Sequence, residues 1–163
     1  MSDARFLDAG PSQAGDAPLR LMALDGDDVP PLSALMQDAV FTGADVTFIA
    51  RRRRFAVLLT RFRWEDQHQA DIDARPYERV RSLLLIDNVI ALRSAGLDIR
   101  AKDAVQSVLA MTWAAQDRLA GCLTIALAGG GAIAMDIEAI DITLRDVARP
   151  HRAQSRARPD HGA

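Results

Sequence analysis

The sequence has very little cysteine and lysine, with one residue of each, Cys122 and Lys102, in a chain of 163 residues. A single cysteine excludes an internal disulfide framework and a zinc site built from several cysteines. No apolar run reaches the length of about 18 residues that a membrane-spanning helix needs, so no spanning segment is expected. The first residues lack a basic stretch followed by an apolar one, so no secretory signal is predicted and the cytoplasm is the expected compartment.

An excess of one charge is also missing. The chain has 20 basic and 22 acidic residues, which leaves a net charge of -2. This near balance gives no overall field that would draw the molecule to nucleic acid or to an acidic membrane, so no membrane partner is expected and nucleic acid ranks last among the partners. Because 49% of the residues are hydrophobic, the chain can build one core. Its length and composition predict a single globular domain over residues 19–150, between polar tails over 1–18 and 151–163 that are predicted to be disordered.

Three consecutive glycines, Gly129 to Gly131, raise the question of a phosphate-binding loop. Such loops open a helix, so that free backbone N–H groups meet the anion, and the best-known form ends in Gly-Lys-Ser/Thr. Here an alternating apolar segment follows, and Lys102 lies elsewhere. The glycines therefore predict the turn of a hairpin, where positive φ angles are needed.

Apolar residues elsewhere in the predicted domain mostly alternate with polar ones, which predicts strands. The segment from Asp28 to Val40 has helical spacing instead, with two prolines that suit a first helical turn. Strands are predicted over residues 19–24, 45–50, 55–64, 77–86, 89–97, 104–113, 121–128 and 132–137, about eight in all. Strands joined by short turns pair antiparallel. The predicted fold is therefore α+β, a largely antiparallel, curved sheet or barrel-like sandwich with one N-terminal helix.

Four segments between or within these strands need separate predictions. Asp87 and Asn88 join two predicted strands and predict a compact hairpin turn. Residues 104–113 fit a helix or a strand, and their strand-like neighbours favour the strand. Residues 138–147 fit a bulged strand or a terminal helix; the strand is preferred, and the helix stays open as the alternative. The polar residues 65–76 predict a long loop.

A run of arginines between two predicted strands is the candidate contact surface. Together with Arg61 and Arg63 in the second of these strands, the run could form a basic strip along one hairpin. Guanidinium groups bind phosphates and carboxylates through paired hydrogen bonds, so the strip could contact an acidic protein or an anionic ligand. The alternative is a solvated hairpin tip whose charge discourages aggregation. The candidate residues are Arg51, Arg52, Arg53, Arg54 and Arg63.

No set of residues combines a nucleophile, a base and an orienting group, so no catalytic residue and no cofactor is predicted. Cys122 has no histidine in a neighbouring predicted strand to act as its base. Two acidic segments could serve an enzyme, and a divalent metal could assist there, but their spacing matches no calcium loop and a single histidine makes a poor zinc site. These segments contain Glu65, Asp66, His68, Asp71 and Asp73, and Asp136 and Glu138.

The order of four motifs resembles the alphaproteobacterial family known as domain of unknown function 2948. The motifs are LRLMALDGDDVPPLSALMQDAV, RRRRFAVLLTRFRWED, ERVRSLLLIDNVIALRSAGLD and AGGGAIAMDIEAIDITLRDVARP. The resemblance covers residues 19–150 and implies a bacterial cytoplasmic protein of about one domain. It implies no catalytic residues, because the family has no established activity.

These observations favour a non-enzymatic binding or adaptor module, since no motif carries a complete catalytic group. Two alternatives remain: a small enzyme with an acidic, metal-assisted site, and a nucleic-acid-binding protein that uses the arginine hairpin. An edge strand of the predicted sheet could also pair with a second copy to form a homodimer.

Overall fold

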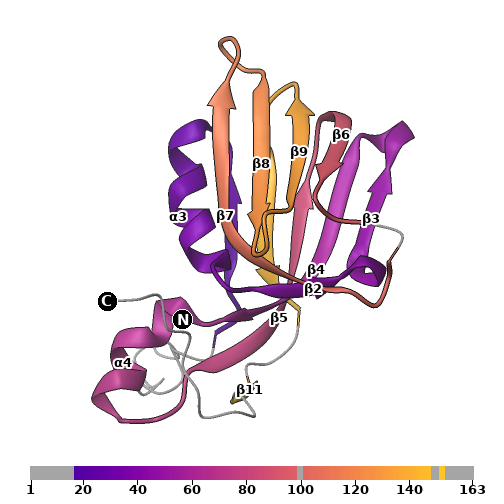
Figure 1. The fold of residues 1–163 in the computed structure, drawn as a ribbon. Helices are drawn as coiled ribbons and strands as arrows, with labels where there is room; N and C mark the ends of the chain where they lie inside the picture. The colour runs from indigo at the N-terminus through magenta and orange to yellow at the C-terminus, as the bar shows by residue number, and fades with distance from the viewer. Residues whose placement is uncertain (1–16, 99–100, 148–150, 153–163) are drawn as a thin grey trace.

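A computed structural model describes residues 17–98, 101–147 and 151–152 of the chain (Figure 1). It confirms the predicted α+β class, with a mainly antiparallel sheet and two helices of more than one turn, α3 (Val29–Met36) and α4 (Gln67–Ile72), in the described residues. The strands are β1 (Arg20–Ala23), β2 (Val40–Thr42), β3 (Val46–Ile49), β4 (Arg54–Phe62), β5 (Glu78–Ile86), β6 (Val89–Ala95), β7 (Val105–Ala115), β8 (Gly121–Leu127), β9 (Ala132–Ile137), β10 (Ile142–Asp146) and β11 (His151–Arg152). The predicted tails lie outside the described residues, except for residues 17–18 and β11.

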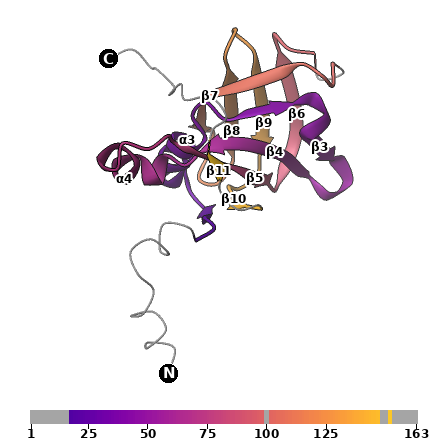
Figure 2. The same ribbon diagram turned by 90° about the horizontal axis from the view of Figure 1, so that it is seen from below.

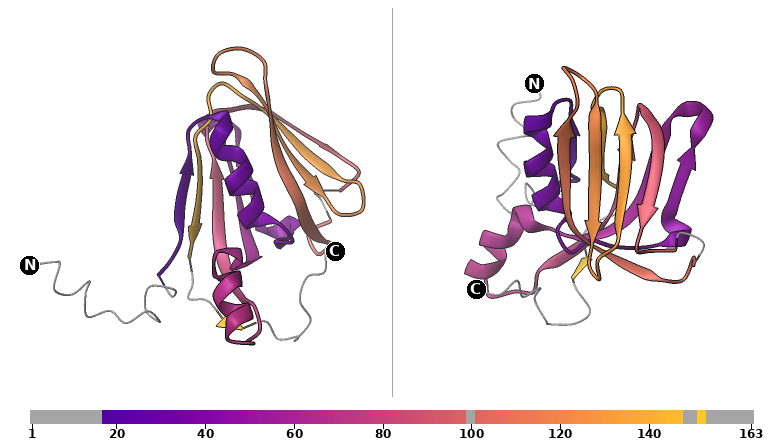
Figure 3. Two further views of the ribbon diagram at one scale, coloured as in Figure 1. Left: turned by 90° about the vertical axis from the view of Figure 1, so that its left-hand side faces the viewer. Right: turned by 45° about the horizontal axis from the view of Figure 1, so that its top comes forward.

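The strands form one sheet that curls without closing. Their order is β1-β10-β5-β4-β2-β7-β8-β9-β6, with β3 beside β4 and β11 beside β5. One half contains β1, β10, β5 and β4, the other contains β7, β8, β9 and β6, and the short strand β2 joins them (Figure 2). The two halves are inclined to each other, and α3 stands at the opening between them (Figure 3). The core lies between the two inner faces.

The hairpin predicted from the three glycines is confirmed. Strands β8 and β9 pair antiparallel, and Gly129 and Gly130 make the turn with φ angles of 88° and 94°. Their buried side chains alternate as predicted, so both strands contribute one face to the core. The buried residues are Leu123, Ile125 and Leu127 on β8 and Ile133, Met135 and Ile137 on β9.

The hairpin predicted at Asp87 and Asn88 is wrong. Strand β5 pairs with β4 and β10, whereas β6 pairs with β9, so the chain crosses here from one half of the sheet to the other. Asn88 has a φ of 62° and donates from its side chain to the carbonyl of Ala139, 3.0 Å away. A turn signal describes the local backbone only, and the neighbours of a strand depend on distant residues. The strand preferred within residues 138–147 is confirmed as β10.

The predicted helix is shorter than expected, and a second helix was missed. Helix α3 ends at Met36 instead of Val40, because Gln37 takes a ψ of 131° and Asp38 a φ of 65°. The chain then turns back into β2, which lies between β4 and β7. Residues 65–76, predicted as a loop, contain the short helix α4.

The expectation that Arg61 and Arg63 lie on a solvated strip is wrong. Both point inward from β4 and its end, with exposed fractions of 0% and 5%. The cause is the alternation of the strand: Arg61 continues the inward series that Phe55, Val57 and Leu59 begin. A buried guanidinium needs charged partners, since its transfer from water is costly.

The partners of Arg61 come from three parts of the chain. Its Nη1 and Nη2 donate to both carboxylate oxygens of Glu65, at 2.9 and 2.8 Å. Its Nη2 also donates to Asp146 on β10 at 2.9 Å, and its Nε donates to Ser82 on β5 at 3.0 Å. Burial opposes the charge on Arg61, but Glu65 and Asp146 outweigh it and hold the pKa of Arg61 above its ordinary value. The second oxygen of Asp146 accepts the N–H of Leu19, which fixes the chain just before β1.

Arg61→Met is expected to lower the free energy of unfolding by about 3–5 kcal/mol, because it leaves the carboxylate of Asp146 buried without its cation. Urea denaturation measures this loss. Arg93→Met is the matched control: its pair with Asp136 is about half exposed, and its loss is expected to cost no more than about 1 kcal/mol. Equal effects of the two substitutions would show that the buried pair does not stabilise the fold.

Candidate functional site

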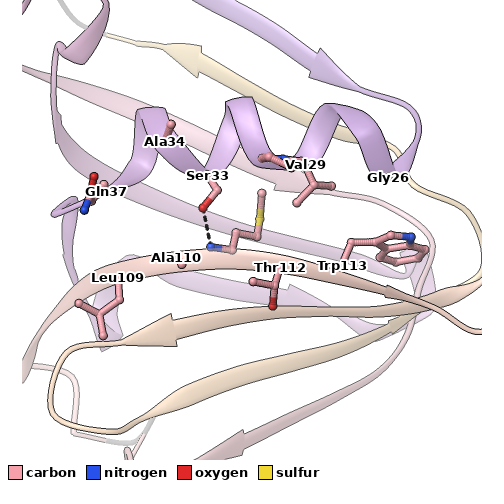
Figure 4. A pocket seen from close by; sticks show the side chains of 11 residues that line it. Gly26, Val29, Ser33, Ala34, Gln37, Leu109, Ala110, Thr112 and Trp113 are labelled. Atoms are coloured by element: carbon pink, nitrogen blue, oxygen red, sulfur yellow. Dashed lines mark hydrogen bonds between the residues drawn. The ribbon is translucent and has the colours of Figure 1, made fainter.

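A groove of about 510 Å³ lies between α3 and the edge of β7 (Figure 4). A pocket of this size is typical of ligand sites in proteins. Its lining is mostly apolar. The helix side consists of Gly26, Val29, Pro30, Ser33, Ala34 and Gln37, and the strand side consists of residues 109–113.

The helix wall follows from the local sequence. Asp25 accepts hydrogen bonds from the N–H groups of Asp27 and Asp28, which closes a short 3-10 turn, η1 (Gly26–Asp28), directly before the helix. Two prolines occupy the first turn of α3, where a missing N–H costs nothing. The helix contains no charged residue, and its inner side chains Leu32 and Met36 are fully buried against the core. This wall is therefore uncharged, and its inner face is anchored in the core.

The strand wall is an edge of β7 that has no neighbouring strand along most of its length in the described residues. Strand β2 pairs with β7 only over residues 105–107. One step further, the N–H and C=O of Val108 still bond to Ala39 and Asp38. From Leu109 onward, no strand in the described part of the chain pairs with the side of β7 that faces α3.

A bulge decides which main-chain groups face this edge. The register of β7 against β8 shifts between Val108 and Ala110, so one extra residue, Leu109, lies there. The shift turns the N–H of Met111 toward α3, where it donates to the hydroxyl of Ser33 at 2.8 Å. Since N–H and C=O groups of alternate residues in a strand face the same edge, those of Trp113 and Ala115 face this edge as well.

Trp113 closes one end of the groove, beside Gly26 (Figure 4). A Cβ atom on Gly26 would lie 2.8 Å from the indole Cδ1, and one on Gly121 would lie 2.6 Å from the indole Cζ2. No side chain fits at either distance, so the two glycines leave the space that the half-buried ring fills. The ring is held in position at the end of the groove and remains partly accessible.

A second, smaller pocket of about 340 Å³ lies near the start of β1 and is lined in part by Arg20, Arg63, Glu65 and Asp66. Arg63 donates to Glu78 at 2.6 Å, while its buried Nε has no hydrogen-bond partner among the residues that the structure describes. The acidic lining residues also have arginine partners within the same cluster. These charges compensate one another.

The five arginines of the candidate contact surface separate into two places. Arg51, Arg52 and Arg53 are exposed at the tip between β3 and β4. Arg54, beside them, donates to Asp87 at 2.7 Å, and this hydrogen bond raises the pKa of Arg54. Arg63 follows the other end of β4, whose nine residues span about 30 Å. The structure therefore brings the first four together without the fifth.

The two acidic segments that could have formed an enzyme site are not brought together. Glu65 lies beside Arg61 at one end of β4, whereas Glu138 pairs with Arg53 at the opposite end at 2.5 Å. Asp136 pairs with Arg93, whose hydrogen bond lowers the pKa of that carboxyl. Among the described residues, no three His, Cys, Asp or Glu side chains are placed to hold a metal ion.

The groove was not predicted, although one sequence feature pointed to it. Residues 104–113 fitted a strand and a helix equally well, and the structure shows a strand with a bulge. The extra residue shifts the alternation by one position, which makes Val105, Val108, Leu109 and Trp113 resemble a helical stripe. A mixed pattern inside a run of strands is therefore a sign of a bulge.

Comparison with known protein families matches residues 19–161 to the family described as Protein of unknown function (DUF2948). No curated protein and no solved structure matches the chain. Within the described residues, neither the length nor the hydropathy of any helix suffices to cross a membrane.

Hydrogen exchange should distinguish the two edges of β7. The amides of Trp113 and Ala115 are expected to exchange at least about tenfold faster than those of Thr112 and Ala114, which bond to β8. The amide of Met111, held by Ser33, should resemble the slower group. Amide-resolved exchange measured by NMR tests this; equal protection of all five amides would mean that the edge is covered.

Proposed function

Since the chain belongs to the DUF2948 family, whose function is not established, we propose from its geometry that it is a non-enzymatic module that binds an extended polypeptide segment in the α3–β7 groove. The observation that carries this proposal is the unpaired edge of β7, which forms one wall of a groove of about 510 Å³. We also place the protein in the bacterial cytoplasm.

An exposed strand edge favours one kind of ligand. It offers a row of N–H and C=O groups, and an extended peptide satisfies such a row by adding a strand. A small ligand without a peptide main chain would leave most of these N–H and C=O groups unpaired. The helical wall, eight residues long, extends about 12 Å, which matches about four residues of an extended chain.

The lining indicates apolar or small side chains in the ligand. No residue of β7 and none of α3 is charged, so neither wall can compensate a charge that the ligand would bury. Trp113 offers an aromatic surface at one end, and the side chain of Leu109 is about half exposed at the other. Aromatic side chains of this kind often provide much of the binding energy of an interface.

The arginine tip is a second proposed contact, for an acidic protein or an anionic ligand. Arg51 and Arg52 support it, because both are exposed and form no ion pair within the described ranges. Arg53 and Arg54 already have acidic partners, and Arg63 is buried. This surface is therefore smaller than the sequence suggested. Nucleic-acid binding and an enzyme with an acidic site rank below both.

Selection of ten-residue peptides from a random phage-displayed library on the full-length protein tests the groove. Selected peptides are expected to bind in extended form. Each peptide amide is then N-methylated in turn. Methylation should weaken binding by about tenfold at every second position only, because only alternate amides of an added strand face β7. Weaker binding at consecutive positions, without this alternation, would contradict strand addition.

A matched pair of proline substitutions locates the binding edge. Ala115→Pro removes an N–H that faces the groove edge, so the protein should fold and bind the selected peptides about tenfold more weakly. Ala114→Pro removes an N–H that bonds to Cys122 on β8, so it should lower the free energy of unfolding by about 2 kcal/mol or more. Thermal melting and peptide titration separate the two effects, and unchanged peptide affinity in Ala115→Pro would place the site elsewhere.

A further inference from the structure

We infer that Ser33 is a placeholder for the ligand: its hydroxyl occupies the hydrogen-bonding position on β7 that a residue of the bound peptide takes. This inference rests on the proposed function of the groove. It assigns to Ser33 control of the affinity of the site, through a bond that must open before the peptide can pair along the whole edge.

The position of Ser33 is unusual for a helix residue. It lies in the middle of α3, and its hydroxyl reaches the main chain of a strand 78 residues away in sequence. The acceptor sits 2.8 Å from the N–H of Met111, a distance typical of the hydrogen bonds that join strands. In the described part of the chain, this bond connects the side chains of α3 to the free edge of β7. Figure 4 shows it crossing the groove.

The bond solves a problem that the end of β2 creates. The Met111 N–H faces away from β8 beyond the last residue that β2 pairs with, and Met111 itself is 2% exposed, so water has little access there. A buried N–H without an acceptor is destabilising. The hydroxyl of Ser33 supplies the acceptor while the groove is empty.

A peptide that adds to β7 competes for the same N–H. No strand in the described ranges pairs with the main-chain groups of Trp113 at this edge, but pairing beyond them toward Leu109 requires the Met111 N–H. The Ser33 Oγ is only two covalent bonds from the helix main chain, so α3 must move outward with the hydroxyl before a peptide main chain can take its place. The released serine can then donate to the carbonyl four residues earlier, here that of Val29. The Met111 N–H exchanges a side-chain acceptor for a main-chain one, and no polar group loses its partner.

A placeholder has opposite effects on the free and bound states. It stabilises the empty protein and lowers the affinity for the ligand, because the ligand must displace it. A residue that only positions α3 would act in the same direction on both, since its loss would loosen the wall and weaken binding. The sign of the change in affinity therefore distinguishes the two roles.

Ser33→Ala tests the inference, with a library-selected decapeptide as the probe. Loss of the acceptor should lower the melting temperature of the free protein by about 3 °C and speed exchange of the Met111 amide. The peptide should bind about fivefold more tightly, because the N–H of Met111 now gains a partner on binding. Ser33→Thr keeps the hydroxyl and should restore wild-type behaviour in all three measurements.

Ser94→Ala is the control, because Ser94 is an exposed serine on β6, which β8 and β9 separate from β7 in the sheet order. It should change neither melting nor binding. If peptides bind the wild type but bind Ser33→Ala equally or more weakly, the placeholder role is wrong while the groove remains a peptide site. If no library peptide binds the wild type, the proposed function is wrong, and the inference about Ser33 is wrong as well.

Discussion

The buried ion pair between Arg61 and Asp146 is the interaction on which the arrangement of the sheet depends. It joins the end of β4 to the end of β10, and Asp146 also holds Leu19 at the start of β1. Three strands that are remote in sequence are thus connected at one point. A buried charge pair tolerates little displacement, because each partner needs the other in a fixed place. Removing one partner would leave a buried charge unpaired at the point where the three strands meet.

The position of the groove depends on this arrangement of strands, although neither Arg61 nor Asp146 lines the groove. With β1 fixed on the outer side of β10, the curled sheet ends there and does not continue to β7. Helix α3 stands in the opening between the two, and residues 37–39 connect it to β2, which ends after three residues. The result is a wall of helix beside a wall of unpaired strand. A sheet that closed completely would have no such edge.

Much of this fold could be predicted from the sequence, because alternation is a local property. The strands around the glycine turn and the inward faces of β8 and β9 were predictable for this reason. The neighbours of β5 and β6 were not, since a turn signal at Asp87 and Asn88 carries no information about distant strands. The alternation of β4 places Arg61 on the buried face, but the charge of its side chain suggested that it is exposed to solvent. The groove needed the bulge and the end of β2 together, and neither can be located from composition.

The register of β7 against β8 makes the groove depend on the number of residues in the strand as well as on their identity. Removing Thr112, which lies beyond the bulge, would move every later residue of β7 by one position against β8, and each later amide would face the opposite edge. Side chains would exchange faces at the same time, so the indole of Trp113 would leave the space between its two glycines. Substitutions along this strand can be gradual, whereas a change of length by one residue would remove the site in a single step. Across related proteins, the number of residues between the bulge at Leu109 and Trp113 is therefore a more informative marker of this groove than the residues that line it.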